Sequence, residues 1–91
     1  MRASKKHFVY ILQCADNTLY TGYTTDTNRR LREHNDNNRR AGARYTRTRT
    51  PVTLVYKEIF PTRSTALKRE MEIKKMTRQK KQSLFVNNKK F

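Results

Sequence analysis

The sequence predicts a small α+β fold in which a three-stranded antiparallel sheet is flanked by helices, in the order β-β-α-β-α-α. Three observations predict it: two short runs rich in β-branched and aromatic residues around a turn-forming cluster, a third such run between two prolines, and helix-start signals after the second and third runs. With 91 residues, of which 34% are hydrophobic, the chain allows one domain with a modest core. We expect this domain to span 1–91, with its core at about 7–85 and loose tails at 1–6 and 86–91.

The first two strands form a predicted hairpin. The runs His7–Cys14 and Leu19–Thr24 read as strands. Ala15–Thr18 joins them as a turn-forming cluster in which Asn tolerates a positive φ. Gly22, inside the second strand, indicates a bulge or the close approach of another backbone or a ligand.

A short helix is expected to follow the hairpin, over Thr27–Asn35. Thr25 or Asp26 offers its N-cap. Its apolar content is thin, and Leu31 is its clear hydrophobic anchor. The residues 36–50 that come next are polar and basic, and they predict a loop.

The second half of the chain predicts a strand and two helices. The strand, over Val52–Phe60, carries apolar residues on both faces, which predicts a central strand covered on both sides. Thr62 or Ser64 caps a helix that is expected to run to about residue 76, and a further basic helix is expected over about 77–85.

Charge is the strongest compositional signal. Lys and Arg number 22 against 7 Asp and Glu, which gives a net charge of +15. Such an excess repels itself unless a polyanion offsets it, and nucleic acid is the usual polyanion. An anionic membrane is the rival, but no apolar run approaches the ~20 residues that span a bilayer. No signal peptide is visible and Cys14 has no partner cysteine, so we expect a cytoplasmic protein with neither a disulfide nor a zinc cluster.

The basic residues cluster in the first helix, in the loop after it and in the later helices. Arginine's planar fork suits bidentate contact with phosphate better than lysine does, and the loop has few compensating acids. The alternative is a plain solvated surface. We predict nucleic-acid contact for these residues: Arg29, Arg32, Arg39, Arg40, Arg44, Arg47, Arg49, Lys74 and Lys75.

Glu70 is a candidate for chemistry because of its place on the helix. Ala66 lies four residues before it and Ile73 three after, so all three share the face that is expected to pack on the sheet. A carboxylate at the edge of an apolar stripe is costly unless it meets a cation. That cation is either a metal ion or an arginine side chain, and the spacing leaves both open.

Two further pairs are candidates. Arg30 and His34 lie one helical turn apart on one face, where they would either hold and activate a phosphate or remain two surface residues. Tyr10 and Tyr20 lie on the two arms of the hairpin, where their phenols could share a face. Aromatic packing is the default role for such tyrosines.

Taken together, these segments resemble the GIY-YIG nucleases. Phe8-Val9-Tyr10 and Tyr20-Thr21-Gly22 are similar to the paired signature that names the family, with a typical interval of ten residues between the tyrosines. Arg29 to Asn35 resembles the helix that carries the family's catalytic Arg, and Ala66 to Glu70 resembles the segment with its metal-binding Glu. Gly42 to Thr46 is similar to a loop of small stand-alone members. Each motif is short, but their order and spacing match over nearly the whole chain.

The hairpin departs from the family pattern at three positions. Phe8 stands where the first Gly of the signature would be, and Thr21 replaces the second Ile. Tyr23 takes the position of a Lys found in some repair and restriction nucleases of the family. That lysine's share of proton handling must therefore pass to another group.

The resemblance implies a metal-dependent endonuclease that acts on structured or single-stranded DNA in repair or processing. Glu70 would bind a single Mg²⁺ or Mn²⁺, weakly without substrate, and Arg30 would clamp the phosphate. Tyr10 or Tyr20 would be the base, with His34 as the group that takes its proton. We expect a monomer that binds DNA; RNA as a ligand and a protein partner for targeting stay open.

Two alternative functions compete with catalysis. One is a non-catalytic basic module that coats RNA or DNA, which the composition alone favours. The other is a nuclease fold that has lost turnover and serves a partner protein. A response to Mg²⁺ separates a nuclease from both.

Overall fold

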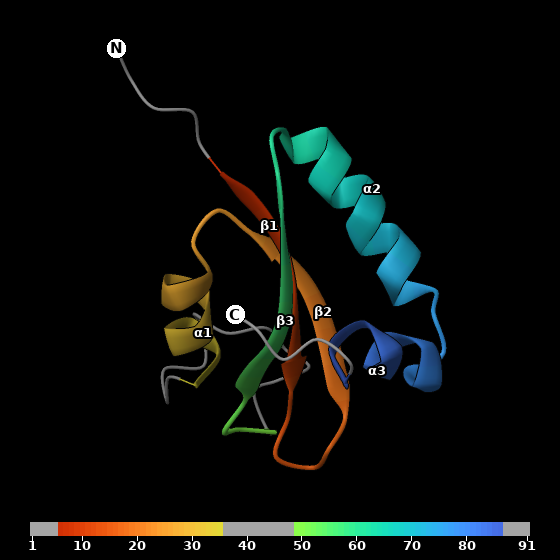
Figure 1. Ribbon diagram of the computed structural model, residues 1–91. Coiled ribbons are helices and arrows are strands. Elements are labelled where there is room, and N and C mark those ends of the chain that lie inside the picture. The colour runs from red at the N-terminus through yellow and green to blue at the C-terminus, as the bar shows by residue number, and fades with distance from the viewer. Residues whose placement is uncertain (1–5, 36–48, 87–91) are drawn as a thin grey trace.

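The computed structural model describes residues 6–35 and 49–86, and its elements follow the predicted order (Figure 1). The strands are β1 (His7–Gln13), β2 (Leu19–Thr24) and β3 (Thr53–Phe60), and the helices are α1 (Thr27–Asn35), α2 (Arg63–Lys74) and α3 (Arg78–Val86). The α+β prediction and its sheet of three antiparallel strands are therefore confirmed.

The prediction of a central third strand is wrong. The strand order is β2-β1-β3, so β1 is central and β3 pairs with β1 alone. In β1 the run from Val9 to Leu12 is buried throughout, as expected for a strand covered on both faces. In β3 no residue is fully buried, and Ile59 is 56% exposed. Apolar residues on both faces of β3 thus reflect partial cover at an edge of the sheet.

Helices cover both faces of the sheet and create two small cores. Figure 1 shows α1 on one side of the sheet and α2 with α3 on the other. On the α2 side, Val9 and Ile11 pack with Ala66 and Ile73. On the α1 side, Tyr10 and Leu12 form a second cluster with Cys14 and Val52, against which Leu31 packs. Side chains of β1 alternate between the two clusters because successive residues of a strand point to opposite faces.

Local polar contacts place the turn and the helix starts where the sequence predicted them. Asn17 adopts a positive φ of 68° in the β1–β2 turn. The Thr62 hydroxyl accepts from the Thr65 amide at the start of α2, and Thr77 does the same for the Lys80 amide of α3. Cys14 is buried, as predicted. None of the helices in the described parts of the chain is long and apolar enough to cross a membrane.

Candidate active site

The two tyrosines of the hairpin share the face of the sheet that α1 covers. Tyr10 pairs with Gly22 and Leu12 with Tyr20, so Tyr10 and Tyr20 are diagonal neighbours with ring centroids 6.4 Å apart. The phenol of Tyr10 lies where a β-carbon on residue 22 would be. The group that approaches Gly22 is therefore the Tyr10 side chain, whereas the sequence predicted a bulge or the approach of a backbone or a ligand.

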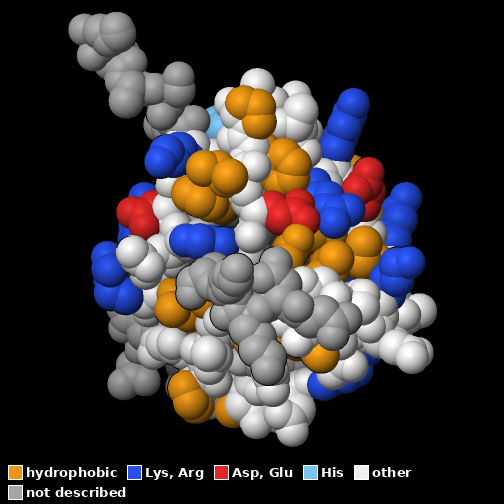
Figure 2. Space-filling view, viewed as in Figure 1, with side chains coloured by type: hydrophobic (Ala, Val, Ile, Leu, Met, Phe, Trp, Pro, Cys, Tyr) orange, Lys and Arg blue, Asp and Glu red, His pale blue; other side chains and the backbone are white. Residues whose placement is uncertain are grey.

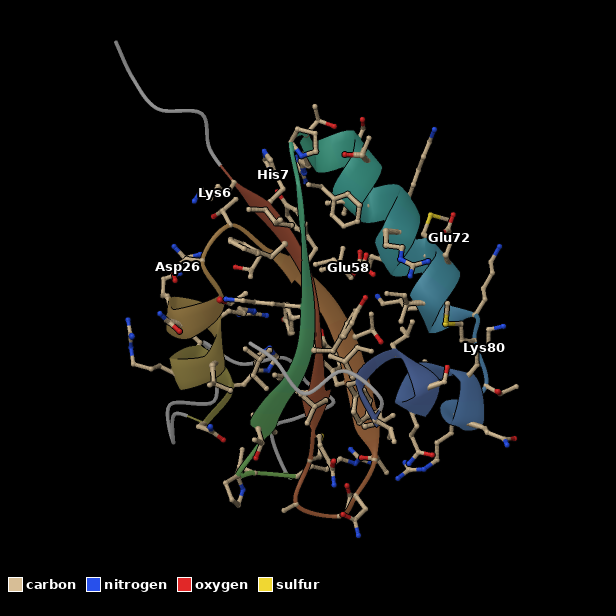
Figure 3. All side chains as sticks on the ribbon, viewed as in Figure 1. Lys6, His7, Asp26, Glu58, Glu72 and Lys80 are labelled. Atoms are coloured by element: carbon tan, nitrogen blue, oxygen red, sulfur yellow. The ribbon has the colours of Figure 1, made fainter. Side chains whose placement is uncertain are left out.

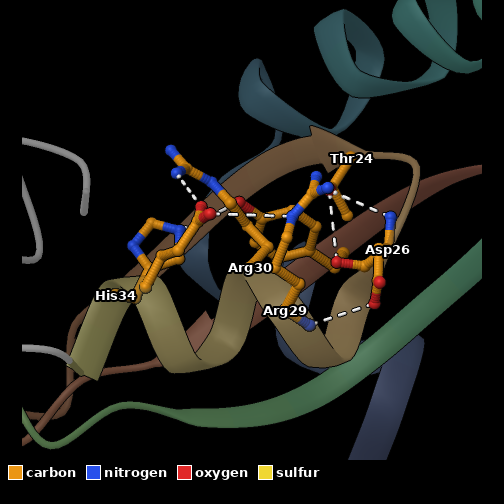
Figure 4. Close-up of polar contacts among 7 residues, drawn as sticks. Thr24, Asp26, Arg29, Arg30 and His34 are labelled. Atoms are coloured by element: carbon orange, nitrogen blue, oxygen red, sulfur yellow. Dashed lines mark hydrogen bonds and ion pairs between the residues drawn. The ribbon is translucent and has the colours of Figure 1, made fainter.

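Helix α1 is held over this face at both of its ends. At its start, the Asp26 carboxylate accepts from the Arg29 amide at 3.0 Å, and the Asp26 amide donates to the Thr24 hydroxyl at 3.1 Å. At its end, the Asn35 side chain forms two hydrogen bonds with the Val52 backbone: it accepts from the amide at 2.7 Å and donates to the carbonyl at 3.0 Å. These contacts position Arg30 and His34, which project from the same helix (Figure 4), and His34 contacts both tyrosines.

His34 packs against both tyrosines and is 1% exposed. Its Nε2 is 3.0 Å from the Tyr10 hydroxyl, and its ring centroid is 5.2 Å from that of Tyr20. Burial, together with the charge of Arg30, lowers the pKa of His34 to about 4. The imidazole is therefore neutral at pH 7, and its Nε2 shares a hydrogen bond with the Tyr10 hydroxyl.

The Tyr10 hydroxyl is a protonated phenol in this environment. Burial raises its pKa to about 12, and the charge of Tyr20 adds to the effect. Arg30 opposes the rise through a hydrogen bond and its positive charge. The Arg30 guanidinium also donates to Glu33 at 2.8 Å, and its side chain is 27% exposed. Arg30 thus faces the phenol and can still be reached from outside.

Glu70 has the partly buried position that the spacing predicted. Its side chain is 16% exposed, and its carboxylate forms an ion pair of 3.3 Å with Lys74. The sequence left open an ion pair between Glu70 and an arginine. In the structure the cation is instead Lys74, which lies one turn further along α2. Glu70 lies close enough to the tyrosine pair for its charge to raise the pKa of Tyr10, after the larger effect of burial. Glu72, by contrast, is 63% exposed.

An ionic contact joins β3 to α2, the helix that carries Glu70. Arg69 donates from Nε and Nη2 to the two carboxylate oxygens of Glu58, at 3.0 and 3.1 Å. Its Nη1 donates to Glu72 at 3.0 Å. Figure 3 shows Glu58 between β3 and α2. Together with the buried side chains of Ala66 and Ile73, this contact connects α2 to the sheet.

The predicted nucleic-acid residues lie on both sides of the sheet. Arg29 and Arg32 belong to α1, whereas Lys74 and Lys75 come at the end of α2 on the other side (Figure 1). Arg49 forms an ion pair with Asp16 at 3.0 Å. Tyr23 pairs with Val9 and packs on the α2 side, away from the site. Four predicted residues lie outside the described parts of the chain: Arg39, Arg40, Arg44 and Arg47.

Sequence reasoning missed three contributors to the site. Glu33 pairs with Arg30, a contact that its spacing of three residues on a helix could have indicated. The hydrogen bonds of Asn35 with Val52 connect residues that are 17 positions apart in the sequence. The contact of Arg69 with Glu58 connects residues that are 11 positions apart. No periodic pattern in the sequence predicts either contact.

Comparison with known proteins identifies relatives of this chain. A family model described as the GIY-YIG catalytic domain matches residues 6–83. A UPF0213 protein of Haloquadratum walsbyi is 63% identical over 78 residues, which cover 86% of this chain and 84% of that protein. A UPF0213 protein of Staphylococcus aureus is 59% identical over 75 residues, 82% of this chain and 88% of that protein.

Two solved structures have a similar fold. The solution NMR structure of the UPF0213 protein BH0048 from Bacillus halodurans matches with a TM-score of 0.58 and 43% identity, and covers 92% of this chain and 86% of that chain. That of the protein EF2693 from E. faecalis matches with a TM-score of 0.60 and 42% identity, over 100% and 95% of the two chains. None of these names states an activity, a substrate or a metal.

Proposed function

Because this chain belongs to the GIY-YIG catalytic-domain family, we propose that it is a divalent-metal-dependent endonuclease that hydrolyses phosphodiester bonds in DNA. The observation that carries the proposal is the group formed by Tyr10, Tyr20, His34 and Arg30 on one face of the sheet. A protein that merely coats nucleic acid has no need of a buried imidazole hydrogen-bonded to a buried phenol. Such a pair supports proton transfer.

Glu70 is the residue that we propose as the metal ligand. No group of three or more His, Cys, Asp or Glu in the described residues could enclose a metal ion. A single partly buried carboxylate suits Mg²⁺ or Mn²⁺, since Mg²⁺ keeps several waters and is bound through one or two carboxylates plus substrate phosphates. When bound, the cation would stabilise charge on the phosphate and on the leaving oxygen.

The protein's own residues supply the remaining chemistry. The Arg30 guanidinium would bind the non-bridging oxygens of the phosphate as negative charge develops on them. Tyr10 is our candidate for the base that takes the proton of the attacking water, and Tyr20 is the alternative. His34 holds the Tyr10 hydroxyl through Nε2 and would accept its proton. The pKa is about 12 for Tyr10 and about 4 for His34 in the free protein, so this transfer needs positive charge near the phenol and negative charge near the imidazole, which a bound cation and the substrate phosphate would supply.

The net charge of +15 supports nucleic acid as the substrate, because basic side chains that neutralise phosphates supply sequence-independent affinity. We propose DNA, with a role in repair or processing, and treat RNA as a competing ligand in the experiment below. The same charge favours a second candidate function, that of a non-catalytic basic nucleic-acid-binding module. We further propose that the protein acts as a cytoplasmic monomer.

Cleavage assays at low salt test the proposal. Labelled single-stranded, duplex, flap and junction DNA and an RNA would each be incubated with the protein in Mg²⁺, Mn²⁺ or EDTA. We expect metal-dependent cleavage that Glu70→Ala and Tyr10→Phe abolish. Glu72→Ala is the matched control, because Glu72 is an exposed acid on the same helix. Salt-sensitive binding without cleavage in either metal would instead identify a binding module.

A further inference from the structure

The face of the sheet that carries Tyr10 extends beyond α1 as a small apolar surface. Phe8 pairs with Thr24 on one side and with Ile59 on the other, so its ring and the Ile59 side chain point to the same face as Tyr10. Phe8 is half-buried and Ile59 is 56% exposed. Lys57, the partner of Tyr10 on β3, places its Nζ 5.4 Å from the centroid of the Phe8 ring.

We propose that Phe8 and Ile59 form a platform on which an unpaired nucleobase stacks, beside the phosphate that is cleaved. The substrate class is then nucleic acid with single-stranded or unpaired nucleotides at the cleavage site. This inference rests on the proposed function and deepens it. The Lys57 Nζ lies over the Phe8 ring, and we expect it to swing aside when the base stacks and to contact the backbone phosphate of the stacked nucleotide.

The spacing of the strand fits this assignment. Phe8 and Tyr10 are two residues apart on β1, which is about 7 Å, a distance that one or two nucleotides span at 3.4 Å per stacked base. A nucleotide next to the reacting phosphate therefore reaches the Phe8 ring. In an intact duplex each base is stacked between its neighbours and cannot lie flat on the sheet. Exposed aromatic residues on a sheet are a known means of binding unpaired bases.

The charge around the platform favours a nucleic acid over an apolar protein segment. Lys57 is exposed, and Lys6 lies two residues before Phe8 at the same end of the sheet (Figure 3). Figure 2 shows apolar side chains beside β3 with Lys and Arg side chains and fewer Asp and Glu side chains around them; of these acids, Glu58 is ion-paired with Arg69. An apolar surface bordered by cations complements a base with its flanking phosphates.

Oligonucleotide binding in EDTA, where no cleavage occurs, tests the platform separately from catalysis. The probes are fluorescein-labelled oligothymidylate, an oligonucleotide of equal length with abasic residues throughout, and a blunt duplex. We expect the protein to bind oligothymidylate roughly tenfold more tightly than the abasic strand, in keeping with the size of base–aromatic stacking. Phe8→Leu keeps the apolar volume but removes the aromatic ring, and should abolish this preference, while Phe8→Tyr restores it.

Further variants make the result specific. Ile59→Ser should reduce the preference several-fold without a loss of folding, because Ile59 is exposed. Met71→Ala is the matched control, since Met71 is an exposed apolar residue of α2 and should leave all three affinities unchanged. Equal affinity of Phe8→Leu and wild type for oligothymidylate would overturn the platform. An equal loss of affinity of Phe8→Leu for the blunt duplex would also overturn it. So would self-association of the protein that Ile59→Ser removes without a change in oligonucleotide binding.

The failure of this inference can be distinguished from the failure of the proposed function. If the protein cleaves nothing in Mg²⁺ or Mn²⁺ but still prefers strands with bases in a way that depends on Phe8, the platform is supported and the catalytic proposal is wrong. Cleavage with no dependence on Phe8 would keep the nuclease and remove the platform.

Discussion

The phenol ring of Tyr10 lies over Gly22 on the neighbouring strand, so that a β-carbon at position 22 would approach the Tyr10 Cζ to 2.6 Å. No glycine in the described residues has a positive φ, so Gly22 is needed for space and not for an unusual backbone conformation. The absence of a side chain at position 22 lets the Tyr10 hydroxyl reach His34. This glycine therefore belongs to the site, although it carries no reactive group.

We predict that Gly22→Ala displaces the Tyr10 ring and destabilises the fold by about 1–3 kcal/mol, the usual cost of an overpacked core. Chemical denaturation measures the change in the free energy of unfolding. In a Tyr10→Leu background the cost should fall strongly, because the clashing ring is absent. An equal cost in both backgrounds would contradict the close-approach explanation.

His34 should make stability depend on pH. Its unfolded pKa is near 6.5, whereas burial and Arg30 lower the folded value to about 4. Between these values the unfolded chain binds more protons, so stability rises with pH. The contribution, of the order of 3 kcal/mol, is complete above about pH 6.5 and is lost as the pH falls through about 4.

Denaturation at about pH 7 and about pH 4 measures this effect. His34→Gln keeps a hydrogen-bonding group near Tyr10, and it should lose much of the difference between the two conditions. His7, the second histidine of the chain, lies in β1 and contacts Tyr23 on the other face. If His7→Gln reduced the difference as much as His34→Gln, His34 would not be its source.

The Glu58–Arg69 contact should influence metal binding through Glu70. Arg69→Lys loses the two-pronged contact with Glu58 at a cost of about 1–3 kcal/mol, typical of hydrogen bonds to charged groups. We expect α2 to turn slightly, so that paramagnetic broadening of backbone amides near Glu70 by Mn²⁺ weakens several-fold. NMR titration with Mn²⁺ measures this without any turnover.

Glu72→Gln is the control for this prediction, because Glu72 contacts the same arginine from an exposed position where an ion pair contributes little. Wild-type broadening in Arg69→Lys would show that the packing of Ala66 and Ile73 alone orients Glu70.

Much of the fold could be predicted because its signals are local. The hairpin follows from two β-rich runs and an asparagine that adopts φ of 68°, and α2 begins where Thr62 offers a cap. The position of β3 could not be predicted in this way. Apolar residues on both of its faces are compatible with the centre or the edge of a sheet, and only the pairing of β1 with both neighbours decides it.

The same holds for the site: local patterns predict its near neighbours, and they do not predict contacts between segments far apart in the sequence. The predicted grouping of Tyr10 and Tyr20 rests on alternation along two paired strands, and that of Arg30 with His34 on helical spacing. The approach of Glu70 to Tyr10, by contrast, depends on how α2 packs against the sheet, and side-chain contacts far apart in the sequence determine that packing. Arg69 and Asn35 act in this way, and neither belongs to a motif that identifies a role.

Asn35 gives the last prediction, because it holds the end of α1 next to His34. Its side chain satisfies both the amide and the carbonyl of Val52, and Val52 is 4% exposed. Asn35→Ala leaves two buried backbone groups without this partner, so we expect a loss of about 2 kcal/mol and a Tm lower by roughly 10 °C. Asn35→Asp keeps the acceptor for the Val52 amide but places a second oxygen opposite the Val52 carbonyl, so it should lose at least half as much. Thermal unfolding checks that both variants are less stable than the wild type; if Asn35→Ala unfolded at the wild-type Tm, the two hydrogen bonds to Val52 would contribute nothing.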